Sequence, residues 1–403
     1  MPVSMIGNTQ VPLGLLCSTT GTYGPTGQAI LSGALLAIEQ IAADPEFDFT
    51  FKPTIADPGG NVARYLELSQ EMLHDGKIAH VMGCYTSSSR KEVVPLFERA
   101  DALLWYPTHY EGFECSENVI YVGASPNQHI VPLAGFMMSA HGKRVYMIGS
   151  NYVWSWESNR VMRDIVESNG GSVVAERYLP VGVTDTDRVI AEIQLLNPDF
   201  VFSSLIGTST AAFLQAHFDA SNAAGNNGER LAPVASCNMS EIDLLALSPQ
   251  ARVDHICSSV YFQSIDSPAN HAFVDQYRAR FGQSVVTPAD AEASYIAVHL
   301  LARAIRMCGS TDVSNVRQVL PECRFDAPQG KVWIDADNQH SFFTPRIGRS
   351  TQDSQFEIVF TAERPVKPDP YLAWFDPKRN LREWHKEIAY GDSQALLPLS
   401  DTR

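Results

Sequence analysis

Short apolar runs alternate with helical stretches twice along this chain, and this alternation constrains the fold more than any other feature. The first series places apolar runs at 11–17, 49–56, 81–84, 102–106 and 119–121, and the second places them at 145–149, 172–178, 200–204 and 233–236. Between the runs, apolar residues recur at helical spacing, as at Ile30, Ala34, Ala37 and Ile41. Strands that alternate with helices predict mainly parallel sheets with helices on their faces.

The length of the chain and the repetition of the pattern predict two lobes. A chain of 403 residues exceeds what one compact core usually supports. Strand-rich texture returns after 331, and the pattern switches near 123–127, 262–266 and 326–333. We therefore expect an α/β protein with two discontinuous lobes joined by a three-stranded hinge. The expected bounds are 9–123 and 264–328 for the first lobe, and 124–263 and 329–385 for the second.

Polar and aromatic side chains follow the predicted strands at the points where the strands end. Tyr85 and Ser87 follow the run at 81–84, and Tyr106 and Thr108 end the run at 102–106. The carboxyl ends of parallel strands meet at one edge of a sheet, where open α/β sheets bind ligands. All four side chains are uncharged, so a small neutral polar ligand is predicted. The alternative for Ser87 is structural, because one serine of 87–89 should cap the helix that begins there.

Composition and motifs argue against several classes of protein. The formal charge of −15 does not suit direct binding of nucleic acid, which needs a basic face. The sequence contains no G-x-S-x-G, H-E-x-x-H, P-loop or C-x-x-C pattern. We therefore expect no catalytic residues, no metal and no cofactor, and a protein that binds rather than reacts.

The beginning of the sequence bears on location. No Lys or Arg precedes Lys52, and the first apolar run, at 11–17, is too short for the core of a signal peptide. No apolar run approaches the ~20 residues that span a bilayer, so no membrane insertion is expected. The prediction is a cytoplasmic protein, with a periplasmic one as the alternative if an export signal precedes this sequence.

Seven segments carry a family resemblance. In order they are Gly83-Cys-Tyr-Thr-Ser-Ser-Ser-Arg-Lys91, Tyr106-Pro-Thr-His-Tyr-Glu-Gly-Phe-Glu114, Ser125-Pro-Asn-Gln128, Gly149-Ser-Asn-Tyr152, Ser264-Ile-Asp-Ser-Pro268, Asp326-Ala-Pro-Gln-Gly330 and Pro368-Asp-Pro-Tyr371. Together they resemble the type I periplasmic-binding-protein family, in its amide- and urea-binding branch. The resemblance spans essentially the whole chain. It implies a bilobal, hinged Venus-flytrap fold that closes around its ligand.

The resemblance also implies which residues bind. Tyr85, Ser87, Tyr106 and Thr108 match pocket positions of the first lobe, and Tyr152, Gly207 and Thr208 match the second. Trp154 stands where the amide-sensing members carry a tyrosine, which removes a phenolic hydroxyl and alters the size of the pocket. Related amino-acid receptors hold the ammonium group with acidic side chains. None occurs around 123–125 or Tyr152, although Glu241 can approach, so a neutral amide or urea fits best.

Two functions follow from the resemblance. The first is a cytoplasmic amide sensor that negatively regulates amidase expression by holding an RNA-binding antiterminator protein inactive. The alternative is the substrate-binding component of a urea or short-chain amide ABC transporter, with a permease as its partner. An enzyme is the third reading. The sequence leaves open a homo-oligomer, the partner's identity and the chain length of the ligand.

Overall fold

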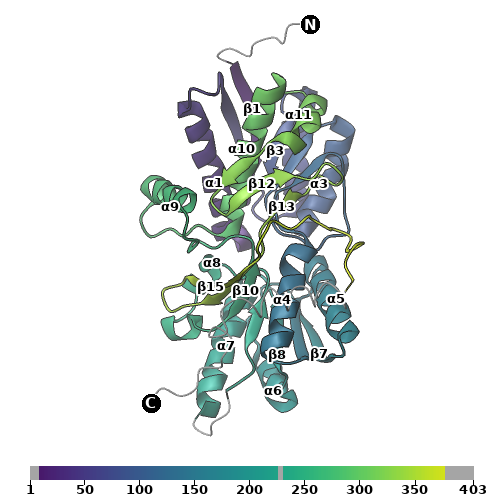
Figure 1. Cartoon of the computed structure of the whole chain (residues 1–403), viewed down its shortest axis with the longest axis vertical. Helices are drawn as coiled ribbons and strands as arrows, with labels where there is room; N and C mark the ends of the chain where they lie inside the picture. Colours follow the sequence, from purple (N-terminus) through teal and green to yellow (C-terminus); the bar gives the residue numbers. More distant parts are fainter. Residues whose placement is uncertain (1–8, 226–229, 377–403) are drawn as a thin grey trace. The chain divides into compact units, whose positions relative to one another are not determined.

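The computed structural model describes residues 9–225 and 230–376, which form two compact units. Of these residues, the first unit contains 9–125, Ile265–Phe343 and Val366–Tyr371. The second contains the described parts of Pro126–Ser264, Thr344–Pro365 and 372–376. Figure 1 shows that each unit is built from a sheet with helices packed on it.

The first unit is organised around a five-stranded sheet in which all strands are parallel. Its order is β2 (Phe49–Ala56), β1 (Thr9–Leu16), β3 (His80–Gly83), β4 (Leu103–Tyr106) and β5 (Val119–Tyr121). The strands β3, β4 and β5 are buried along their whole length, which explains why they read as continuous apolar runs. The predicted parallel α/β architecture is confirmed for this unit.

Helices cover both faces of this sheet. They are α1 (Gly24–Ala43), α2 (Val62–Leu73), α3 (Ser87–Ala100), α9 (Pro268–Phe281), α10 (Ala289–Cys308) and α11 (Val313–Val319), with short 3-10 turns at Gly21–Tyr23, His74–Gly76 and Leu320–Glu322. The helices α1 and α10 approach closely at Gly33, where a Cβ atom would lie 2.0 Å from the Ala291 carbonyl oxygen. The Ser294 hydroxyl donates to the Ile30 carbonyl across the same contact, at 2.7 Å. Distant parts of the sequence therefore share one core.

A small antiparallel sheet completes the first unit. It consists of β11 (Phe325–Ala327), β12 (Gly330–Ile334) and β13 (Ser341–Phe342). The expected boundary at 328/329 is therefore displaced, because the chain changes units between Phe343 and Thr344. It changes again after Pro365 and after Tyr371, so the expectation of three crossings is incomplete. Residues 377–385 of the expected second lobe lie outside the described residues.

The second unit contains a seven-stranded sheet. Its order is β15 (Phe356–Thr361), β14 (Arg346–Ser350), β10 (Ile256–Ser259), β9 (Val234–Ser236), β8 (Phe200–Ser204), β6 (Arg144–Ser150) and β7 (Ser172–Leu179). The five strands from β6 to β10 run parallel, whereas β14 and β15 pair antiparallel at one edge. The mainly parallel sheet expected here is also confirmed.

The helices of the second unit follow its strands. They are α4 (Pro126–Ala140), α5 (Val153–Ser168), α6 (Asp187–Leu196), α7 (Thr208–Gly225) and α8 (Glu241–Leu245), with a 3-10 turn at Pro249–Arg252. The core lies between these helices and the sheet, and includes Tyr146, Ile148, Val201 and Phe213.

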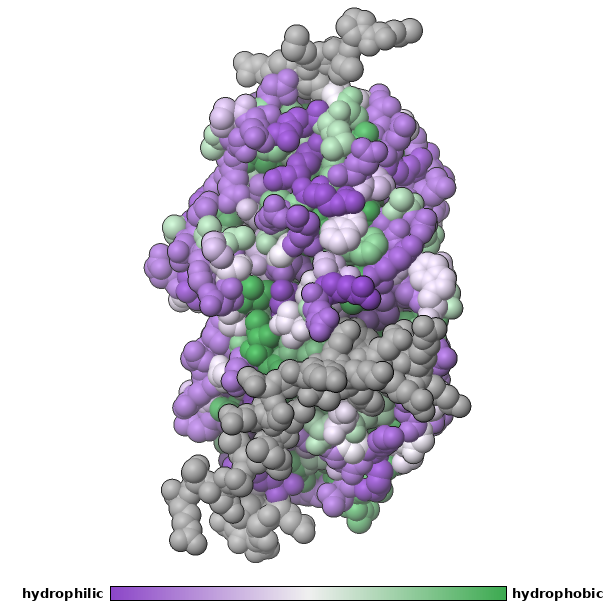
Figure 2. Space-filling view, viewed as in Figure 1, coloured by the Kyte–Doolittle hydropathy of each residue, from purple (hydrophilic) through white to green (hydrophobic). Residues whose placement is uncertain are grey.

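The surface offers no continuous apolar belt on the face drawn in Figure 2, where hydrophobic residues occur in small groups among hydrophilic ones. Large exposed hydrophobic side chains such as Leu195 and Trp374 are scattered along the sequence. Within the described ranges, no helix combines the length and hydrophobicity that crossing a bilayer requires.

Candidate functional site

The carboxyl edge of the first sheet is shaped by two strand ends. β3 ends at Gly83, whose backbone has a φ of 149° and passes so close to β1 that a Cβ atom would lie 2.2 Å from the Leu16 carbonyl oxygen. Cys84 follows with a left-handed φ of 63°, which turns the chain toward Tyr85. β4 pairs with β3 in parallel and ends at Tyr106. The Tyr106 hydroxyl donates to the Tyr85 carbonyl oxygen at 2.7 Å, so the two turns meet as predicted.

The helix α3 starts at this edge, and its cap differs from the prediction. Thr86 is the capping residue, because its side chain accepts from the Ser89 backbone N–H at 3.2 Å. The Ser89 hydroxyl donates back to the Thr86 carbonyl oxygen at 2.8 Å. The expectation that a serine of 87–89 caps the helix is therefore wrong. Since Thr86 takes this role, the Ser87 side chain serves another purpose.

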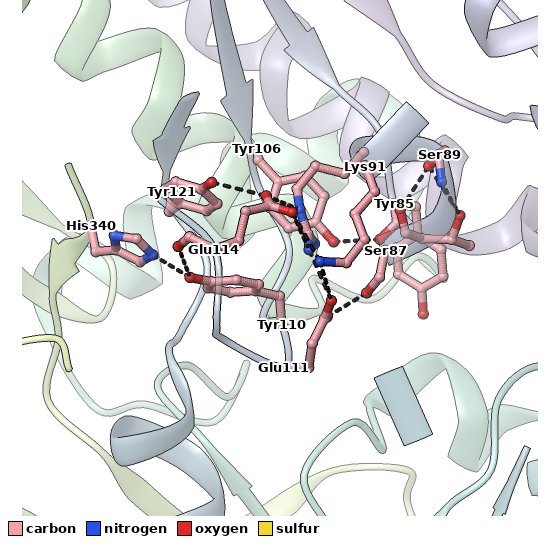
Figure 3. A network of polar contacts seen from close by, with 12 residues as sticks. Tyr85, Ser87, Ser89, Lys91, Tyr106, Tyr110, Glu111, Glu114, Tyr121 and His340 are labelled. Atoms are coloured by element: carbon pink, nitrogen blue, oxygen red, sulfur yellow. Dashed lines mark hydrogen bonds and ion pairs between the residues drawn. The ribbon is translucent and has the colours of Figure 1, made fainter. Parts of the chain in front are cut away.

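Ser87 instead contacts a group of charged residues that the sequence analysis did not select. Its hydroxyl donates to the Glu111 carboxylate at 2.5 Å (Figure 3). We call Arg90, Lys91, Glu111 and Glu114 the Arg90 cluster. Their segments were quoted for the resemblance, but the polar strand ends were read as uncharged. A clue in the sequence was the position of Arg90, one helical turn after Ser87.

The Arg90 cluster is held together by short ion pairs. The Arg90 guanidinium is fully buried and lies 3.0 Å from Glu111 and 2.7 Å from Glu114. Its centre also lies 4.7 Å from the ring centroids of Tyr106 and Tyr110, a cation–π geometry. Lys91 lies 3.1 Å from Glu114 and 3.5 Å from Glu111. With two cations and two carboxylates, the cluster has no net charge.

The electrostatics favour the charged forms of Glu114 and Arg90. Burial alone would raise the pKa of Glu114, but Arg90 and Lys91 outweigh it and lower the pKa to about 2. Burial alone would lower the pKa of Arg90, yet Glu111, Tyr106 and Glu114 raise it well above its usual value. The Glu114 carboxylate and the Arg90 guanidinium therefore stabilise one another.

A stack of three aromatic rings packs next to the Arg90 cluster. The His340 ring lies 4.0 Å from Tyr121 and nearly parallel to it, and the Tyr110 and Tyr121 rings stack with their centroids 5.1 Å apart (Figure 3). His340 Nδ1 lies 2.6 Å from the Asn338 carbonyl oxygen, which can only accept, so this nitrogen carries the proton. The Tyr110 hydroxyl approaches Nε2 at 2.5 Å. Tyr121 donates to Glu114 at 2.9 Å and links the stack to the cluster.

Thr108 is held at the same edge by a close backbone contact. A Cβ atom on Gly123 would lie 1.9 Å from the Thr108 carbonyl oxygen, so only glycine leaves room for this approach. The Thr108 side chain is buried, and its hydroxyl has no hydrogen-bond partner in the described part of the chain. A buried hydroxyl without a partner is unfavourable unless a ligand or water completes it. Tyr23 was not predicted as a site residue. Its ring packs against Tyr85, with the two ring centroids 5.4 Å apart.

The arrangement fixes the polarity of two hydroxyl groups. A carboxylate and a carbonyl oxygen can only accept. The Ser87 hydroxyl therefore donates its hydrogen to Glu111, and the Tyr106 hydroxyl donates its hydrogen to the Tyr85 carbonyl oxygen. A further partner of either hydroxyl must then donate to its oxygen. The edge is therefore suited to groups that bear N–H or O–H.

The remaining predicted residues lie at the carboxyl edge of the second sheet. β6 and β8 are neighbours in register, with Gly149 opposite Ser204. Tyr152 stands immediately before α5, and Trp154 is buried in the first turn of that helix rather than in a loop. Gly207 has a left-handed φ of 61°, and the exposed Thr208 begins α7.

Four of the eight predicted residues thus lie at the carboxyl edge of the first sheet, and four lie at that of the second. Their contact with a ligand stays a prediction. Ser209 and Thr210 were missed. Both are buried, and their hydroxyls have no hydrogen-bond partner among the described residues. Glu241 is buried and accepts from the Gln263 backbone N–H at 2.9 Å.

Comparison with known proteins identifies the architecture. A family model described as "Periplasmic binding protein domain" matches residues 11–377. A solute-binding protein of an ABC transporter from Rhodopseudomonas palustris HaA2, solved with p-hydroxybenzoic acid, has a TM-score of 0.79 at 20% identity, covering 91% of this chain and 99% of that one. The two-lobed fold expected from the sequence is confirmed.

Two curated relatives differ in how much of the chain they match. "Limonene hydroxylase" of Geobacillus stearothermophilus is 33% identical over 118 residues, which are 29% of this chain and 22% of that protein. This chain thus spans about a fifth of that relative's length. "Leu/Ile/Val-binding protein homolog 6" of Brucella melitensis is 22% identical over 287 residues, covering 70% of this chain and 73% of the relative.

Proposed function

We propose a function from the premise that this chain belongs to the periplasmic binding protein domain family: it binds a small neutral amide, such as acetamide or urea, without transforming it. The observation that carries the proposal is the polarity of Ser87 and Tyr106, whose hydroxyls donate to Glu111 and Tyr85, so that a ligand must donate to their oxygens. An amide NH₂ supplies two donors to such a site. Its carbonyl oxygen can accept from Thr108, whose buried hydroxyl has no partner within the described ranges.

The charge of the site supports a neutral ligand. The Arg90 cluster balances two cations with two carboxylates, so it offers no uncompensated charge to an ion. The names of the relatives mention ligands with carboxylates, namely branched-chain amino acids and p-hydroxybenzoic acid. The carboxylate group of such a ligand has no donor for the oxygens of Ser87 and Tyr106. We therefore propose that this edge does not hold a carboxylate and that the chain differs from those relatives in its ligand.

The role that we favour is the substrate-binding component of an ABC transporter for urea or short-chain amides. The family match and the transporter proteins among its structural relatives support this role over regulation. They give no support to the cytoplasmic location expected from the sequence. We propose the periplasm, the alternative that the sequence left open.

The second candidate is the amide-responsive regulator with an antiterminator partner. The ordered segments from Gly83 to Tyr371 favour it, since they resemble the branch that contains such a sensor. Fractionation of the native host separates the two roles. Recovery from the periplasm supports the receptor, whereas cytoplasmic recovery together with an RNA-binding protein that amide releases supports the regulator.

Calorimetric titration with acetamide, propionamide, butyramide, urea, p-hydroxybenzoate and leucine tests the ligand class. We expect heat of binding from one or more amides or urea and none from the two carboxylates. Binding of leucine or p-hydroxybenzoate alone would overturn the proposal. Release of ammonia from an amide would restore the enzyme as a candidate.

Thr108→Val tests whether the unpartnered hydroxyl meets the ligand. The variant should weaken amide binding by about 1–3 kcal/mol, because a ligand group loses its hydrogen bond, while the stability of the chain stays level or rises. Ser69→Ala is a matched control, since Ser69 is a fully buried residue of α2 whose hydroxyl also has no partner within the described ranges. An unchanged affinity in Thr108→Val would remove Thr108 from the site.

A further inference from the structure

The Glu111 carboxylate is fixed in place and takes the Ser87 hydrogen. Glu111 is 1% exposed and belongs to the loop after β4. One of its oxygens accepts from Ser87 at 2.5 Å, and the other accepts from Arg90 Nη2 at 3.0 Å. The two oxygens therefore have different partners. Rotation of the Glu111 carboxylate would break its buried ion pair with Arg90, which is unfavourable. The ion pair therefore keeps the other oxygen in contact with the Ser87 hydroxyl.

Arg90 holds Glu111 from a position that is itself rigid. Its guanidinium has no exposed surface, and it donates to Glu114 through Nε at 2.7 Å. The rings of Tyr106 and Tyr110 lie 4.7 Å from it. Since Arg90 can only donate, it requires an acceptor at the nearer oxygen of Glu111.

We propose that Glu111 is a positioning residue that sets ligand selectivity by turning Ser87 into a hydrogen-bond acceptor. This inference rests on the proposed function, because it assumes that the ligand meets Ser87. In the native chain, Ser87 raises the affinity for a ligand that donates a hydrogen bond, such as an amide NH₂. It lowers the affinity for a ligand that can only accept, such as the carboxylate of the same shape.

Glu111→Gln should reverse the polarity of Ser87 with little change in shape. Arg90 would attract the amide oxygen of the new side chain, which places the NH₂ group beside Ser87. The Ser87 oxygen would then accept from that NH₂, and its hydrogen would turn toward the ligand. A carboxylate would gain a donor, whereas an amide NH₂ would lose an acceptor.

Titration with acetamide and acetate measures this change, because the two ligands have nearly the same shape. We expect the native chain to prefer acetamide, and Glu111→Gln to reduce the ratio of the two affinities by about tenfold or more. Glu117→Gln is the matched control, since Glu117 is 82% exposed and pairs with Arg317, and it should leave the ratio unchanged.

The possible failures are distinguishable. If the native chain binds neither amide nor urea, the proposed function fails and this inference fails with it. If the native chain prefers acetamide and folded Glu111→Gln keeps the same ratio, only the role of Glu111 is overturned. If Glu111→Gln does not fold, the same titration with acetamide and acetate is carried out on Ser87→Ala. Loss of the acetamide preference in that variant supports the role of Ser87 as acceptor, and retention overturns it.

Discussion

The carboxyl edges of the two sheets use hydroxyl groups in different ways. In the first unit, Ser87 and Tyr106 donate their hydrogens to fixed acceptors beside the Arg90 cluster. In the second unit, the buried hydroxyls of Ser209 and Thr210 have no partner in the part of the chain that the structure describes. Ser87 and Tyr106 therefore have a defined polarity, whereas the hydroxyls of Ser209 and Thr210, like that of Thr108 in the first unit, can still turn in either direction.

This difference indicates how specificity is divided. An edge with fixed hydrogen positions discriminates between donor and acceptor ligands, because a mismatch leaves a buried polar group unpaired. An edge whose hydroxyls can rotate adapts to either kind of group. We infer that the first unit selects the chemical class of the ligand.

Acid should produce the largest effect on stability and should act on both units. Burial lowers the pKa of His80 and His217 to about 4 and of His299 and His340 to about 3. Their pKa values are near 6.5 when the chain is unfolded, so the unfolded chain binds more protons between pH 6.5 and 4. The free energy of unfolding should therefore fall as pH drops, by about 1–2 kcal/mol per histidine between pH 7 and 5.

Urea unfolding at pH 7, 6 and 5 measures this loss. Glu114 should stay charged over the same range, since its pKa is held at about 2. Stability that is constant from pH 7 to 5 would contradict the assignment of neutral buried histidines.

Removing the cation at the centre of the first edge should be the next largest change. Arg90→Met leaves the Glu111 and Glu114 carboxylates without their main buried partner. The free energy of unfolding should fall by about 3–5 kcal/mol, measured by urea unfolding. Arg64→Met is the matched control, because the Arg64 side chain is 50% exposed in its pair with Glu67, and it should cost less than about 1 kcal/mol. Equal losses in the two variants would show that the cluster contributes no more than a surface ion pair.

The smallest effect is expected at the second edge. Thr210→Val removes a buried hydroxyl that makes no hydrogen bond within the described residues, and the two side chains have similar shapes. The free energy of unfolding should change by less than about 0.5 kcal/mol or rise slightly. Thermal unfolding of Thr210→Val beside Ser87→Ala makes the comparison direct, because Ser87→Ala deprives a buried carboxylate of a donor. A large loss in Thr210→Val would erase the distinction between the two edges.

The sequence predicted the sheets and the strand-end residues because both depend on local pattern. Buried parallel strands read as apolar runs, and polar residues just after them fall at the carboxyl edge. Local pattern failed where the outcome depends on distant contacts. Within the strand-rich stretch after 331, β13 and β14 belong to different units, and Pro345 between them cannot donate to a strand ladder.

The Arg90 cluster escaped prediction for a similar reason. A buried arginine is unusual, and the burial of Arg90 depends on two carboxylates more than twenty residues away together with the rings of Tyr106 and Tyr110. Spacing along the chain does not reveal such a group. The capping serine was misjudged because Thr86, Ser87, Ser88 and Ser89 are all suitable capping residues, and only the backbone of Thr86 has the extended conformation that a cap needs.

Titration of the native chain with acetamide and acetone tests the central claim most directly. The two molecules are neutral and nearly equal in shape, and they differ in whether an NH₂ or a CH₃ group faces the acceptors at the first edge. We predict that acetamide binds at least about tenfold more tightly, because acetone offers no N–H to these hydroxyl oxygens. Equal affinities would contradict the claim that Ser87 and Tyr106 select the ligand by accepting its hydrogen bonds.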